Sequence, residues 1–216
     1  MTIILDGTNG VTTPSPVVVQ GSTSGSITIA APAVAGSNTA TLPAGTGTIA
    51  VQGASTNIVS GTAWTYTSGT PSSIDFTNIP SWVKRITMTV ADLSFAAAGT
   101  ARVRLGTSGG LATTGYSGGI LSVPNAGTGS VTGLGSAPQG IAAFSSTDGT
   151  TLITSQIIIT NLTGNTWVSS GVAYRVNDSV GTVFSGNVVL SGTLDRISLV
   201  ATTSTFDAGS VNILYE

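Results

Sequence analysis

Tyr116 is the residue whose type and position are best suited to ligand binding. It lies in residues 106–140, a stretch rich in Gly, Ser and Thr that is predicted to form the longest surface loops. An aromatic ring on such a loop can stack on a sugar face while polar neighbours orient the sugar. Arg102 and Arg104 share one face of a predicted strand and would favour acidic glycans. These three residues are the candidate receptor-binding site, and burial of Tyr116 is the competing interpretation.

The other aromatic residues are expected to pack inside the fold or between subunits. Trp82 follows Pro80, which fixes φ and ends a strand, so the indole can fold onto the core. Sugar recognition by Trp82 is the alternative. Trp167 and Tyr174 have opposite parity on one predicted strand, so at most one of them can face the core.

Residue types that serve catalysis or metal binding are scarce. The chain has no Cys and no His, which excludes disulfides, thiol chemistry and a Ser/His/Asp triad. Four acids that could form the carboxylate pair of a glycosidase stand singly in turns or at strand ends: Asp148, Asp178, Asp195 and Asp207. Asp148 before Gly149 is interpreted as a turn residue, and Asp195 as an ion-pair partner of Arg196. We expect no enzyme, no cofactor and no metal.

Charge is missing from a long N-terminal segment. Between Asp6 and Asp75, 68 consecutive residues carry no charged side chain. Because soluble monomers usually expose many charges, we expect copies of the chain or partners to cover this segment. The net charge of −2 provides no basic face for nucleic acid. No apolar run suits a transmembrane helix, and residues 1–7 lack the basic start of a signal peptide.

The pattern of elements predicts an all-β protein. Runs of β-branched residues alternate with polar ones between turn residues, without sustained helical spacing. Residues 1–20 are predicted as an extended arm, 21–52 as a β-rich shaft or connector, and 53–216 as a β-sandwich of jelly-roll type. The strands expected from the alternation are 26–29, 40–42, 47–50, 62–67, 85–90, 101–105, 152–160, 166–174, 182–184, 187–190, 196–201 and 211–215. Tight hairpin turns are expected at Asp148-Gly149, Gly164-Asn165, Gly186-Asn187 and Ala208-Gly209.

Several segments resemble a known family. The run IDFTNIPSWVKRIT at 74–87 is similar to a segment of tail-fibre and related virion proteins of tailed bacteriophages. Thr114-Gly115-Tyr116 and the LDRI run at 194–197 fit the same pattern, and GSITI at 25–29 with TLPAGTGTI at 41–49 resembles a short module of phage fibres. The resemblance covers most of residues 21–216. It implies a homotrimer with an N-terminal attachment region and a C-terminal β-rich head, and it supplies no catalytic residue.

The expected function is therefore a structural fibre of a tailed-phage virion whose C-terminal domain attaches to host polysaccharide. Such a protein is made in the host cytoplasm and released by lysis. The expected partners are further copies in a homotrimer and virion proteins bound through the N-terminal arm, without nucleic acid or membrane insertion. A virion protein without a receptor, such as a head fibre, collar or tail adaptor, is the alternative. A polysaccharide-degrading enzyme is disfavoured.

Overall fold

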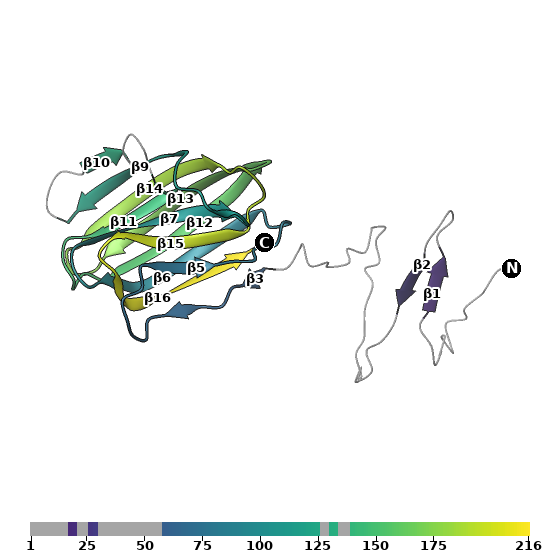
Figure 1. The fold of residues 1–216 in the computed structure, drawn as a ribbon, viewed down its shortest axis with the longest axis horizontal. Helices are drawn as coiled ribbons and strands as arrows, with labels where there is room; N and C mark the ends of the chain where they lie inside the picture. The colour runs from purple at the N-terminus through teal and green to yellow at the C-terminus, as the bar shows by residue number, and fades with distance from the viewer. Residues whose placement is uncertain (1–16, 21–25, 30–57, 126–129, 134–138) are drawn as a thin grey trace. The chain divides into compact units, whose positions relative to one another are not determined.

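The prediction of an all-β fold is confirmed. The computed structural model describes residues 17–20, 26–29, 58–125, 130–133 and 139–216, and these residues form strands, turns and bends without a helix (Figure 1). No helix in these ranges is therefore long and apolar enough to cross a bilayer. The chain divides into two compact units, Met1–Ala50 and Val51–Glu216.

The described part of the first unit is a two-stranded antiparallel sheet. Strand β1 (Val17–Gln20) pairs with β2 (Ser26–Ile29), and Val18 lies opposite Thr28. Strand β2 coincides with the strand predicted at 26–29. The predicted strands at 40–42 and 47–50 lie outside the described residues, as do residues 1–16 of the predicted arm.

The second unit contains a nine-stranded antiparallel sheet, called the larger sheet below. Its strand order is β10-β9-β14-β13-β12-β6-β16-β3, and β4 also pairs with β16. The bounds are β3 (Val59–Ser60), β4 (Trp64–Thr65), β6 (Arg85–Phe95), β9 (Tyr116–Pro124), β10 (Ser130–Gly133), β12 (Ile153–Thr163), β13 (Thr166–Arg175), β14 (Val180–Val189) and β16 (Phe206–Tyr215).

A smaller, five-stranded sheet lies across one face of the larger sheet (Figure 1). Its order is β11-β7-β15-β5, and β8 pairs with β7. The bounds are β5 (Ser73–Phe76), β7 (Gly99–Thr107), β8 (Gly110–Leu111), β11 (Ala142–Ser146) and β15 (Arg196–Thr203). Both sheets are open, and β11 forms one edge of the smaller sheet.

One hydrophobic core fills the space between the two sheets. Ile157 and Ile159 enter it from β12, and Val103 and Leu105 enter it from β7, all four without solvent exposure. Successive residues of a strand point to opposite faces, so this alternation fixes which side of each strand is buried. On β12 and its neighbours, the side chains at the alternate positions point away from this core. They form the opposite face of the larger sheet, called the outer face below.

One of the four predicted hairpin turns is confirmed. Gly164-Asn165 connects β12 and β13. Asp148-Gly149 connects β11 to β12, which belong to different sheets, so it forms a corner between the sheets. Gly186-Asn187 lies inside β14 and Ala208-Gly209 inside β16, so the prediction of turns there is wrong.

The prediction of long loops within 106–140 is wrong for its described residues. Strand β9 spans nine residues of this stretch and pairs with both β14 and β10. Gly118 and Gly119 lowered the predicted strand propensity. Pairing of the whole of β9 with β14, and of residues 119–122 with β10 as well, outweighs that local preference through cross-strand contacts.

Candidate functional site

Tyr116 is a core residue, and the prediction that its ring is exposed for stacking is wrong. The side chain is 5 % exposed. Its hydroxyl accepts a hydrogen bond from the Leu105 amide at 2.9 Å and lies 3.0 Å from the Ala112 carbonyl oxygen. A buried Tyr whose hydroxyl has partners is a structural residue. The ring therefore offers no platform for a sugar.

Arg102 and Arg104 lie on one face of β7, as predicted. Arg104 donates to the backbone oxygen of Gln139 at 2.7 Å and to its side-chain Oε1 at 3.0 Å. Arg102 lies opposite Ala143 on the edge strand β11, and its Nη1 is buried without a hydrogen-bond partner. The two guanidinium groups therefore differ, since Arg104 is held by Gln139 and Arg102 has unused hydrogen-bonding capacity.

The remaining aromatic predictions are largely confirmed. Trp167 is buried and Tyr174 is exposed, in agreement with their opposite parity on β13. Trp82 is only partly buried. It packs against the core at its margin, with its ring centroid 5.9 Å from that of Tyr215. The prediction of a core position is therefore right for the contacts of Trp82 and too strong for its degree of burial.

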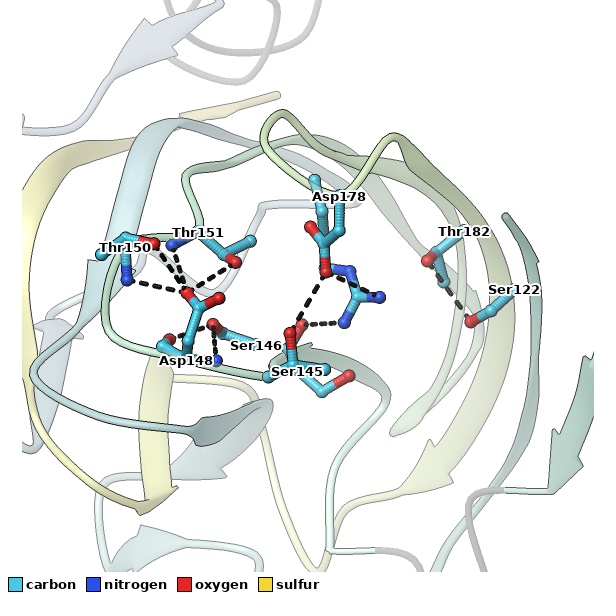
Figure 2. A network of polar contacts seen from close by, with 10 residues as sticks. Ser122, Ser145, Ser146, Asp148, Thr150, Thr151, Asp178 and Thr182 are labelled. Carbon is cyan, nitrogen blue, oxygen red and sulfur yellow. Dashed lines mark hydrogen bonds and ion pairs between the residues drawn. The ribbon is translucent and has the colours of Figure 1, made fainter. Parts of the chain in front are cut away.

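Arg102 lines a groove at the edge of the smaller sheet, and we call this groove the arginine groove. It has a volume of about 180 Å³ and lies where the larger sheet extends beyond β11. Its lining residues come from both sheets: Thr100, Arg102, Ala143, Phe144 and Ser145 from the smaller, and Ile120, Ser122, Ile153, Ala173, Arg175 and Thr182 from the larger. Figure 2 shows three of its polar members, with Ser122 and Thr182 paired on one side and Ser145 nearer to Asp178.

The charge in the arginine groove comes from two arginines and no lining acid. Arg175 donates to the Ser145 carbonyl oxygen at 3.2 Å and pairs with Asp178 at 3.1 Å. Asp178 is not among the lining residues, so it balances Arg175 from beside the groove. Burial, and then repulsion from Arg104, lower the pKa of Arg102 below its ordinary value. An anion in the groove would oppose both effects and raise the pKa of Arg102, since it would pair with a charge that is partly desolvated.

Asp148 and Asp195 make hydrogen bonds and an ion pair within the fold. Asp148 Oδ1 accepts hydrogen bonds from the amides of Thr150 and Thr151 at 2.8 and 2.9 Å and from both hydroxyls (Figure 2). These bonds, led by the Thr150 amide, lower the pKa of the Asp148 carboxyl. Asp195 pairs with Arg196 at 3.1 Å, as predicted. Among the described residues, no three acidic side chains gather where a metal ion could bind.

The outer face of the larger sheet is uncharged across four neighbouring strands and carries exposed apolar side chains. Leu121, Val183 and Val172 lie opposite one another on β9, β14 and β13, and they are 40, 54 and 56 % exposed. A neighbouring row of small residues, Gly119, Ser185 and Ser170, leaves a hollow of about 580 Å³. Other large apolar side chains on this face include Val123, Ile158, Val168, Tyr174 and Val189. Outward positions of β9, β14, β13 and β12 carry neither acid nor base.

Sequence reasoning missed Arg175, Ser122 and Thr182 as members of a possible site. Pairing of β9 with β14 places Ser122 opposite Thr182, and no spacing in the sequence indicates that these two residues are neighbours. The outer face had a weak signal, the run Ile157-Ile158-Ile159, because consecutive apolar residues in a strand indicate burial on both sides. Comparison with known proteins finds no matching family model, no curated relative and no similar solved structure.

Proposed function

We propose that this chain is a structural fibre component of a tailed-phage virion that works as a homo-oligomer. In this proposal the second unit is a β-sandwich head of jelly-roll type, and copies pack against one another through the outer face. The observation that carries the proposal is the exposed row Leu121, Val183 and Val172, on strands whose outward positions carry no charge. Isolated soluble domains seldom leave a contiguous apolar surface of this kind uncovered.

A second copy of the chain suits this face better than an unrelated charged partner. Two copies can meet without burying an unpaired charge, since neither acid nor base projects from the four central strands. The charge-free strands β9, β14, β13 and β12 lie about 4.8 Å apart and each contributes about nine residues of about 3.3 Å, so this face measures roughly 19 by 30 Å. That is on the order of the 800 Å² that each partner buries in a standard interface.

The phage fibre assignment draws on the sequence at 74–87 and on the uncharged N-terminal segment. A homotrimer is the proposed state, with residues 1–20 as the arm that joins the head to other virion proteins. Charge-free residues in that arm would be covered by the virion partner, as the outer face would be covered by neighbouring copies.

Two measurements test the proposal: the number of chains in the oligomer and the presence of the protein on phage particles. Native mass measurement of the full chain should give three chains, and antibody labelling should place the protein on purified phage particles. A chain without residues 1–20 should still assemble into three-chain oligomers and should no longer be incorporated into phage particles. A stable soluble monomer, or particles that carry the truncated chain normally, would contradict the assignment.

Attachment to the host surface is the second candidate function, and it is supported by the arginine groove. The burial of Tyr116 removes the aromatic platform on which attachment was first predicted. Arg102 remains, in a groove with hydroxyl and apolar walls. Soluble host polysaccharide should compete with phage adsorption if this groove contacts the host. If soluble polysaccharide does not change phage adsorption, the assembly role remains the proposed function.

A further inference from the structure

The arginine groove combines three kinds of wall that a single small ligand could use. Arg102 supplies a guanidinium whose Nη1 is buried without a partner. Ser122 and Thr182 supply hydroxyl groups from the larger sheet, and their mutual contact is long, at 3.5 Å. Ile120 and Phe144 supply apolar surface beside them.

The size of the groove restricts the ligand to a small group. Its volume of about 180 Å³ lies below the roughly 300–1,000 Å³ of pockets that hold drug-sized molecules. The groove is also partly open to solvent beside the edge strand β11, which lines it with Ala143, Phe144 and Ser145. One ring of a longer polymeric ligand can therefore enter the groove while the neighbouring units of that ligand stay outside.

The mixture of walls indicates a sugar acid better than an inorganic anion. A carboxylate would accept paired hydrogen bonds from the planar guanidinium of Arg102. Ring hydroxyls would exchange hydrogen bonds with Ser122 and Thr182, and the C–H face of the ring would lie on Ile120. Inorganic phosphate could accept hydrogen bonds from the guanidinium and the hydroxyls, and it would leave the apolar wall without a partner.

We propose that the arginine groove binds one carboxylate-bearing sugar residue, with Arg102 on the carboxylate. Arg175 is already paired with Asp178 and braces the groove through the Ser145 carbonyl oxygen. The inference names the ligand class of the attachment role and goes beyond the proposed assembly. It stands on residues at the β11 edge, which are separate from the outer face, so either proposal can fail alone.

The test is a titration of the full chain with each ligand, in which binding is monitored by saturation-transfer NMR. This method detects weak ligands of large assemblies. The probes are glucuronate, glucose and inorganic phosphate. Glucuronate should bind at least tenfold more tightly than glucose, and phosphate should compete only at much higher concentration. Arg102→Gln should weaken glucuronate binding at least tenfold with an unchanged melting temperature, since Nη1 has no protein partner to lose.

Arg104→Gln is the matched control because it removes the same charge from the same strand face outside the groove. It should change glucuronate affinity less than threefold. Arg102→Lys keeps the charge and removes the planar fork, so it should bind several-fold more weakly than the wild type even if Arg102→Gln misfolds. Equal affinity for glucuronate and glucose, equal affinity for glucuronate and phosphate, or unchanged glucuronate binding by Arg102→Lys would each overturn the proposal.

Discussion

The hydroxyl of Tyr116 in the larger sheet completes the hydrogen bonding of Leu105 in the smaller sheet. It accepts from the Leu105 amide at 2.9 Å and lies 3.2 Å from the Leu105 carbonyl oxygen. Pairing of β7 with the edge strand β11 ends with Val103 opposite Ala142, two residues before Leu105. Tyr116 therefore satisfies the β7 backbone beyond the end of β11 and links the two layers.

Removing this hydroxyl should destabilise the fold without exposing a new surface. Tyr116→Phe leaves the buried Leu105 amide without its acceptor, which should cost about 1–3 kcal/mol in the free energy of unfolding. Urea unfolding followed by circular dichroism measures the change. A variant as stable as the wild type would show that water or another group replaces the hydroxyl.

Alkaline pH should weaken the wild type through the same residue. Burial raises the pKa of Tyr116 to about 12, against smaller opposing effects of the Leu105 hydrogen bond and Arg104. In the unfolded chain Tyr ionises near pH 10. Above that pH the unfolded state holds fewer protons than the folded state, so stability falls as pH rises from about 10 to about 12. The stability difference between wild type and Tyr116→Phe should narrow over this range, and a constant difference would contradict the assignment.

Gly209 should tolerate no side chain. Its φ is +101°, and a Cβ there would lie 2.5 Å from the Leu93 Cα, at a bulge where the register of β16 against β6 shifts. Gly209→Ala should therefore cost more than about 2 kcal/mol. Gly181→Ala is the control, because its nearest neighbour would be the Val123 oxygen at 3.9 Å, an ordinary contact. Chemical unfolding of both variants checks the contrast, and equal stability would argue against the bulge.

Trp82 should contribute packing energy at the margin of the core. Because its ring is partly buried against Tyr215, Trp82→Ala should cost about 2–3 kcal/mol, less than the about 3–5 kcal/mol of a fully buried Trp. Denaturant unfolding and phage adsorption should be measured together. Normal stability with lost adsorption would favour the alternative, in which Trp82 recognises a sugar.

Alternation of apolar and polar residues was enough to predict the long central strands. The runs at 85–90 and 166–174 fall within β6 and β13, and the run at 152–160 falls within β12 except for Leu152, because one side of each strand is buried in the core. Their ends were misplaced, since bulges such as the one between Asn161 and Thr163 extend the strands past the regular pattern.

Most of the wrong sequence predictions involve glycines. A Gly can indicate either a turn or a position where two segments of the backbone pack closely together. Gly186 was interpreted as a turn residue. It lies in β14, where a Cβ would meet the Ile141 oxygen at 2.6 Å and the Ser117 oxygen at 2.9 Å. Only the packing of β14 against its neighbours requires Gly there, and such packing is not visible in the local sequence. The arginine groove was missed for the same reason, since pairing across distant strands assembles it.

The central claim is that copies of this chain associate through the outer face, and a pair of charge substitutions tests it most directly. Gly119→Arg places a charge on that face at a position where an added Cβ would meet nothing within 4 Å. Gly109→Arg adds the same charge in the turn between β7 and β8, where the nearest atom would be the Thr107 hydroxyl at 3.5 Å. Native mass measurement should show an intact oligomer for the wild type and Gly109→Arg, and monomers for a folded Gly119→Arg. An intact oligomer of Gly119→Arg would contradict the claim.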